Sequence, residues 1–315
     1  MCPGTFTIAI SNIQFQKFTM KKNILLLTIF SVCLSIGKIA AQQDSVMTSL
    51  QSNNTKEFVS GAFKSSRVIN GHSVEMIGKN VLDVRILHRF GLINTGFNNL
   101  YGLDQATMRM GFDYGLTKGL TIGIGRSTYK KEWDGLIKFR ITQQSKGPGA
   151  FPFSIVWVSG MTTSTVEYPD TDAKHDLENR IGYYHEVIIG RKFNSWFSLQ
   201  VSPVYVHQNY VDSVSHNDTW ALGIGSRIKL SRRIAFVVDY HPILSGREPG
   251  TTDPLSIGID IETGGHVFQL HFSNSQGMNE RAFITETTDK WGKGEIRFGF
   301  NLSRVFSIGK QKTPN

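Results

Sequence analysis

Cysteine is almost absent from this chain of 315 residues, which contains only Cys2 and Cys33. Both lie within the first 41 residues, a stretch that we expect to be removed during export. The mature chain would then form no disulfide. An exported protein without disulfides has to obtain its stability from a closed sheet or from a large core.

Two other features are missing from the sequence. Beyond residue 41, no apolar run approaches the roughly 20 residues that a transmembrane helix needs, which excludes membrane-spanning helices. The formal net charge is +9, yet the basic residues do not gather into clusters that track a phosphate backbone. Nucleic acid is therefore not an expected partner.

The start of the chain has the order of a secretory signal peptide. The basic stretch 20–23 precedes an apolar segment, 24–36, and small residues follow at Ala40 and Ala41. The apolar segment is too short to cross a bilayer as a helix, so we expect cleavage after Ala41. Because residues 1–19 carry no targeting pattern, we expect residue 20 to be the true initiator. Loss of residues 1–41 removes four lysines and no acid, which lowers the formal charge from +9 to +5.

From residue 80 onward, apolar and polar residues alternate with a period of two, which is typical of strands with two different faces. Leu82 and Val84, for example, alternate with Asp83 and Arg85. About twelve such segments lie within residues 80–306, each near the roughly 9–11 residues of a tilted transmembrane strand.

The connections between these segments alternate between short and long, as in barrels with short periplasmic turns and longer outer loops. Short connections fall at 115–118 and 231–233, and longer ones at 91–104 and 209–217. Glycines recur on the charged face, which suits a crowded lumen, and aromatic residues gather near strand ends, which suits interfacial girdles. We therefore predict an all-β fold, a closed antiparallel up-and-down transmembrane barrel of about 12 strands (about 10 to 14).

The predicted organisation has four parts. A barrel over residues 80–306 follows the signal peptide and an N-terminal periplasmic segment, 42–79, and precedes a C-terminal tail, 307–315. Within the N-terminal segment, residues 58–69 have no place in the strand count, and an extra strand, a plug and a tether all stay open. A soluble, periplasmic, lipocalin-like binding barrel would show the same alternation with its apolar face inward, and it remains an alternative.

Six runs of residues carry a resemblance to a known family: HRFG (88–91), GIGRS (123–127), RKF (191–193), SLQVSP (198–203), IETGGHVFQLHFSNS (261–275) and GFNLSRVF (299–306). They resemble a family of Gram-negative outer-membrane β-barrels called domain of unknown function 5777. The resemblance covers residues 56 to 306, and the run 261–275 is its most specific part. It implies a barrel located in the cell outer membrane, and it brings no activity, cofactor or catalytic residue.

A possible catalytic pattern lies in this most specific run. His271, Ser273 and Asn274 resemble the His-x-Ser-Asn signature of outer-membrane phospholipases, which implies His271 as the base and Ser273 as the nucleophile. Because Phe268 and Leu270 form the apolar face of this strand, His271 and Ser273 should point into the lumen. That is the wrong side for attack on a bilayer lipid. A phospholipase-like hydrolase stays an alternative, and we favour a protein without enzymatic activity.

Charged residues on the predicted lumen face are the other candidates. A basic surplus would favour anionic solutes, whereas mixed charges would pair into a structural network in a barrel of about twelve strands, and we favour the network. Asp134, Glu186 and Asp239 are among the acids. The network proper comprises Arg85, Arg109, Asp113, Lys138, Arg140, Arg227, Lys229, Asp260, Glu262 and Arg297.

Four acidic residues lie close together in a predicted outer loop. Asp170, Asp172, Asp176 and Glu178 have oxygen ligands suited to Ca²⁺, but they lack the glycine and the twelfth-position acid of an EF-hand, so a solvated acidic loop is favoured. No cofactor is expected. The sequence predicts an outer-membrane barrel acting as a narrow pore, a transporter or a structural membrane component, with outer-membrane lipid and a small solute as partners.

Overall fold

The computed structural model describes residues 55–166, 176–211, 214–263 and 266–308. The predicted signal peptide, residues 1–41, lies outside these ranges. So do residues 42–54 of the N-terminal segment and 309–315 of the tail.

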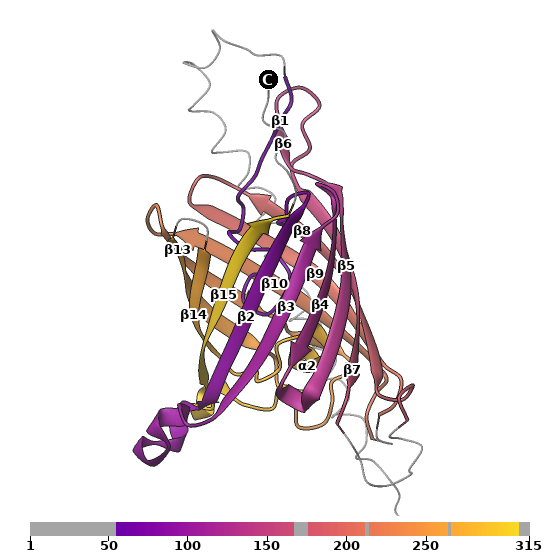
Figure 1. Ribbon diagram of the computed structural model, residues 1–315, viewed down its shortest axis with the longest axis vertical. Helices are drawn as coiled ribbons and strands as arrows, with labels where there is room; N and C mark the ends of the chain where they lie inside the picture. The colour runs from indigo at the N-terminus through magenta and orange to yellow at the C-terminus, as the bar shows by residue number, and fades with distance from the viewer. Residues whose placement is uncertain (1–54, 167–175, 212–213, 264–265, 309–315) are drawn as a thin grey trace, which may run out of the picture. The chain divides into compact units, whose positions relative to one another are not determined.

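Within the described ranges, twelve long antiparallel strands form a closed ring (Figure 1). Each strand pairs with the next long strand along the chain, and the ring closes where the last strand pairs with the first. This confirms the predicted up-and-down barrel. The strands are β2 (Val81–Leu92), β3 (Ala106–Gly115), β4 (Leu120–Ser127), β5 (Glu132–Thr142), β7 (Ser154–Ser164), β8 (Ile181–Lys192), β9 (Phe197–Gln208), β10 (Asp218–Lys229), β11 (Ile234–Tyr240), β13 (Leu255–Thr263), β14 (His266–Ser273) and β15 (Arg297–Ser307).

Short elements decorate the connections. The strand β1 (Glu57–Phe58) pairs with β6 (Ser145–Lys146), which lies in the connection between β5 and β7, and β12 (Ile243–Ser245) pairs with β10. One α-helix, α2 (Glu280–Thr285), lies in the connection from β14 to β15. No helix of the described residues is long and apolar enough to cross a membrane. The 3-10 turns are η2 (Ile93–Thr95), η3 (Phe97–Gly102), η4 (Tyr129–Lys131) and η6 (Trp291–Lys293).

Side chains alternate between an exposed outer face and a buried inner face. On β14, Phe268 and Leu270 are 41% and 43% exposed, whereas Gln269 and His271 are buried. A lipocalin-like barrel would show the opposite, with the apolar residues inside. Large apolar side chains on the outside and polar ones inside are the arrangement that a lipid environment favours.

The inner wall has one apolar sector, formed by β7 to β10. Val156 and Val158 of β7, Ile188 of β8 and Val206 of β9 are fully buried. They belong to a cluster that includes apolar residues from two segments that enter the barrel, namely Ala62, Phe63, Val68, Val74, Phe283 and Ile284. Full burial of such a side chain is worth about 1.5–3 kcal/mol. Because the cluster joins inward-facing wall residues to these two segments, the hydrophobic core lies inside the ring.

An outer face in contact with lipid predicts a cost for Ile259→Arg in the middle of β13. Ile259 is 41% exposed on the outside, and an arginine near the bilayer midplane costs about 2–4 kcal/mol. The control is Leu116→Arg in the turn after β3, where the cost near an interface is about 0–1 kcal/mol. Urea unfolding from lipid vesicles, followed by tryptophan fluorescence, measures both. Equal midpoints for the two variants would contradict the lipid-facing assignment.

Candidate functional site

The segment 59–78 folds into a short hairpin inside the barrel. Arg67 and His72 face each other across an isolated β-bridge, and the N–H of Val68 donates to the carbonyl of Gly71 at 2.8 Å. The tip has the sequence Val-Ile-Asn-Gly, and Asn-Gly is a pair that favours tight turns. The hairpin is buried, so its backbone groups need partners from the barrel wall.

Asp239 of β11 holds the tip of this hairpin. Its Oδ2 accepts hydrogen bonds from the N–H groups of Ile69, Asn70 and Gly71 at 3.2, 2.7 and 3.0 Å. Its Oδ1 lies 2.7 Å from Nε2 of His241. Because hydrogen bonds to an ionised acceptor are roughly twice as strong as neutral ones, one buried carboxylate fixes three consecutive backbone groups.

Lys138 of β5 holds the base of the same hairpin. Its Nζ donates to the carbonyl oxygens of Ser66, Ser73 and Glu75 at 3.0, 2.7 and 2.8 Å. An ammonium group has three donors, so these bonds use all of them. The wall thus supplies a carboxylate that accepts from the N–H groups of the hairpin and an ammonium group that donates to its C=O groups.

The connection from β14 to β15 also enters the lumen. Asn279 caps α2, since its Oδ1 accepts from the N–H of Ala282 at 2.9 Å, and its Nδ2 donates to Glu132 of β5 at 2.7 Å. Arg281 forms ion pairs with Glu132 and with Glu286. Burial alone would raise the pKa of Glu286, but the Arg281 charge outweighs it and holds this pKa at about 2.

The two inward segments meet at a buried ion pair. Nη1 of Arg67 lies 2.6 Å from Oε1 of Glu280, and both side chains are 2% exposed. Nε2 of His72 lies 3.2 Å from the same oxygen. Burial, reinforced by the Arg67 charge, lowers the pKa of His72 well below its usual value, so the imidazole is neutral. Removal of one partner from a buried ion pair leaves an uncompensated charge and costs about 3–5 kcal/mol.

The ten charged residues predicted for the lumen face divide into two groups in the structure. Six of them are buried, namely Arg85, Arg109, Asp113, Lys138, Arg227 and Asp260. The other four are partly exposed, namely Arg140, Lys229, Glu262 and Arg297.

Most of these residues have a polar partner. Nε of Arg109 donates to Oδ1 of Asp134 at 2.8 Å, and Arg85 pairs with Asp83 at 2.5 Å. Among the buried residues, Asp260 also accepts from Gln269 at 2.6 Å. The partly exposed residues have partners as well: Lys64 pairs with Glu262 at 2.6 Å, Asp289 pairs with Arg297 at 2.9 Å, and Gln143 accepts from Arg140 at 2.9 Å.

Sequence reasoning did not identify Arg67, His72, Glu280 and Arg281 as part of this network. They lie in segments without strand periodicity, and nothing local marks them as inward. A signal was present elsewhere, because residues 154–208 include strands that are apolar on both faces. In a membrane barrel the outer apolar face can contact lipid, but an apolar inner face has to pack against other protein, which indicates a filled interior.

The phospholipase-like residues take structural positions. Oγ of Ser273 lies 2.8 Å from Oγ of Ser256, and neither ring nitrogen of His271 has a hydrogen-bond partner within the described ranges. The imidazole packs against Gly299, where a Cβ would lie 2.5 Å from its Nε2. Asn274 accepts from a backbone N–H and donates to backbone carbonyls nearby. The geometry gives the Ser273 hydroxyl no base.

Only two of the four predicted calcium ligands lie within the described residues. Asp170 and Asp172 lie outside the described residues, whereas Asp176 and Glu178 begin the range 176–211. In the part of the chain that the structure describes, no group of three or more His, Cys, Asp or Glu side chains is arranged to hold a metal ion.

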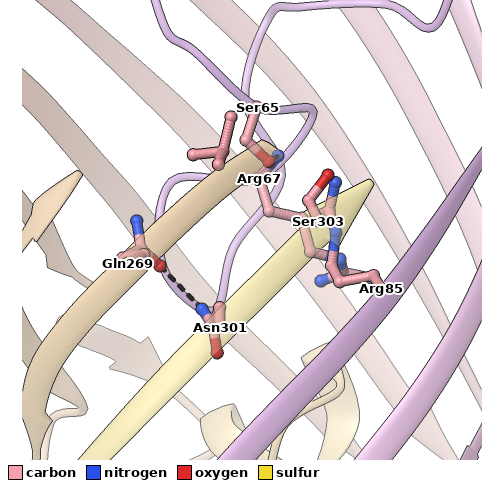
Figure 2. A pocket seen from close by; sticks show the side chains of 7 residues that line it. Ser65, Arg67, Arg85, Gln269, Asn301 and Ser303 are labelled. Carbon is pink, nitrogen blue, oxygen red and sulfur yellow. Dashed lines mark hydrogen bonds between the residues drawn. The ribbon is translucent and has the colours of Figure 1, made fainter. Parts of the chain in front are cut away.

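Two adjoining cavities lie between the hairpin and the wall formed by β2, β13, β14 and β15. The larger, about 330 Å³, is lined by Phe63 and Lys64 of the inward segment and by residues of these strands. The smaller, about 10 Å³, lies further in and shares part of the wall. Figure 2 shows its lining, with Arg67 from the hairpin and Arg85 from β2.

The chain matches the model of one known protein family. The family model of a membrane-bound β-barrel domain, domain of unknown function 5777, matches residues 63–306. No curated protein matches the chain. Similar solved structures include the NanC porin (10% identity, TM-score 0.46, covering 73% of this chain and 100% of that one). Others are the KdgM porin (6%, 0.43, 72% and 99%) and an outer membrane channel from Pseudomonas putida F1 (11%, 0.43, 74% and 98%).

The tight contact at the hairpin tip predicts that Gly71→Ala destabilises the protein. A Cβ at this position would lie 2.8 Å from Cε1 of His241, so the hairpin or the imidazole has to move. Such overpacking costs about 1–3 kcal/mol. Gly292→Ala is the control, because nothing lies within 4 Å of its Cβ position. Urea midpoints in detergent test this, and a loss of equal size in both variants would argue against the contact.

The neutral His72 predicts a loss of stability in acid. Below its usual pKa of 6.5 the unfolded chain takes up a proton that the folded protein does not, so this stabilisation is complete above pH 6.5 and falls as the pH falls below it. The slope is at most about 1.4 kcal/mol per pH unit. His72→Gln should lack this contribution, as measured by the difference between the two unfolding free energies from pH 7.5 to 5. Parallel curves would show that His72 titrates normally.

Proposed function

The chain belongs to the membrane-bound β-barrel family called domain of unknown function 5777, and from this membership we propose that it is an outer-membrane barrel acting as a closed channel or transporter for a small solute. The lumen contains the two inward segments and the buried charges described above. A solute can pass only where these segments move aside.

The Arg67–Glu280 ion pair is the observation that carries this proposal. The hairpin precedes β2, and the α2 connection follows β14, so the two segments enter from opposite ends of an up-and-down barrel. They are 213 residues apart in sequence and join through side chains. A barrier made of two pieces can open at their junction without unfolding of the barrel, because the wall strands keep their own hydrogen bonds.

The proposed location follows from the membrane-bound barrel and its even strand number. An even number of strands places the start of β2 and the end of β15 at the same end of the barrel, and in outer-membrane barrels the short turns face the periplasm. The hairpin would then enter from the periplasm and the α2 connection from outside. Export to this membrane is the role proposed for the signal peptide of residues 1–41, with outer-membrane lipid surrounding the wall.

A static structural role is the second candidate, and the apolar cluster favours it. The hairpin contributes Val68 and Val74 to the cluster on β7 to β10, and the α2 connection contributes Phe283. Together with the bonds from Lys138 and Asp239, this packing opposes movement of both segments. In this interpretation, the lumen charges form a structural network that never opens.

Single-channel recording in a planar bilayer separates the two roles. Wild-type protein should be closed for most of the time, whereas Glu280→Gln should open much more often because it leaves Arg67 buried without its carboxylate. The charge-reversed pair Arg67→Glu with Glu280→Arg should restore closure in part. Glu57→Gln on the exposed strand β1 is the matched control and should behave as wild type.

The folded state of each variant has to be checked on the same preparation. A closed barrel migrates differently on a gel before and after boiling, and every variant should retain this difference. Absence of discrete conductance steps in both wild type and Glu280→Gln, with the barrel intact, would reject the channel and leave the structural role.

A further inference from the structure

Two of the residues that line the smaller cavity are arginines with unpaired donors. Nε and Nη2 of Arg67 and Nε of Arg85 are buried, and none of these atoms has a partner among the described residues. Both arginines are only 3% exposed. Each lost hydrogen bond of a buried charged group is costly, so three unpaired nitrogen donors on two residues of one cavity indicate a missing acceptor.

The other polar groups of this wall already have partners. Nδ2 of Asn301 donates to Oε1 of Gln269 at 2.6 Å, the bond drawn in Figure 2. Nε2 of Gln269 donates to the carbonyl of Val68 at 2.5 Å, and Oγ of Ser303 donates to Asp83 at 2.5 Å. Within the described ranges, the buried atoms of the wall that lack a partner are therefore all donors.

Net charge does not explain the unpaired donors. The guanidinium groups that line the cavity or bond to its wall are matched in number by carboxylates that do the same. They are Arg67, Arg85 and Arg89 on one side, and Asp83, Asp260 and Glu280 on the other. The site is balanced in charge, and the unmet donors alone determine which group fits.

Size and hydrogen-bond capacity narrow the choice of ligand. About 10 Å³ holds roughly one water-sized group. A water molecule donates as well as accepts, whereas a carboxylate oxygen only accepts and so matches a wall whose unpaired groups are donors. Charge-assisted bonds from guanidinium groups to a carboxylate are also the stronger kind. The adjoining cavity of about 330 Å³ has room for the remainder of a small molecule.

We propose that this pair of cavities binds a small monocarboxylate. Its carboxylate lies between Arg67 and Arg85, and its body extends into the larger cavity toward Lys64 and Glu262, whose ion pair lines that cavity. This proposal names the class of solute for the proposed channel. Binding of the carboxylate does not depend on the channel function, but its passage through the barrel does. Arg67 also pairs with Glu280, so the same side chain would contact the ligand and join the two inward segments.

Nitrogen NMR of the full-length protein in detergent micelles tests binding directly. With ¹⁵N-labelled arginine, titration with sodium formate should shift the Nε–H resonances of Arg67 and Arg85 and reach saturation. Arg85→Lys keeps the charge and removes one unmet donor, and it should weaken formate binding about tenfold or more. Arg227→Lys is the matched control, because Nε of Arg227 is also buried without a partner in the described residues but lines neither cavity.

The outcomes are distinct from those of the conductance experiment. Shifts that never saturate, or that Arg85→Lys leaves unchanged, would overturn the site. Chloride that shifts the same resonances as tightly as formate would overturn the carboxylate and indicate a halide. Binding is measured here on closed protein without any current. A barrel that never conducts can still bind formate, and a barrel that does not bind formate can still conduct.

Discussion

Closing a sheet of about twelve strands leaves a lumen that is wider than the filled interior of an eight-stranded barrel and narrower than the open channel of a sixteen-stranded one. The wall's own inward side chains do not fill such a space. Here two segments from outside the ring occupy it, the hairpin of residues 59–78 and the connection that carries α2. Most of the other features of the structure follow from the need to hold these segments inside.

The two inward segments are held by hydrogen bonds and ion pairs, because their buried backbone and charged groups need partners. A hairpin inside the barrel brings N–H and C=O groups that have to be paired, and Asp239 and Lys138 pair them from opposite parts of the wall. The α2 connection is anchored by Arg281, whose guanidinium bonds carboxylates of β5 and of the same connection. One apolar cluster joins both segments to β7 to β10, and the Arg67–Glu280 ion pair joins the segments to each other.

Arg67 and Arg85 differ from other lumen arginines with unpaired nitrogens, such as Arg227, in that both line the smaller cavity. Nε and Nη2 of Arg109 both donate to Asp134, as expected for a structural pair. Arg67 and Arg85 each keep a carboxylate partner and still present unmet donors to one cavity. His271 and Ser273 lie on the same inward face, but they have no mutual geometry that would support hydrolysis.

The barrel could be predicted from the sequence because the alternation on strands such as β2 and β13 depends on neighbouring residues alone, and a period of two assigns each side chain to a face. Asp113, Lys138 and Asp260 were placed on the inner face in this way. The partners of Lys138 could not be predicted, because they are backbone carbonyls of a segment without periodicity. Nor could the pairing of Arg67 with Glu280, since residues so far apart in sequence meet only after the ring has closed and both segments have entered it. The sequence by itself determined the strands and their faces, which are local properties, and the tertiary structure alone decided what fills the lumen, because that depends on long-range packing.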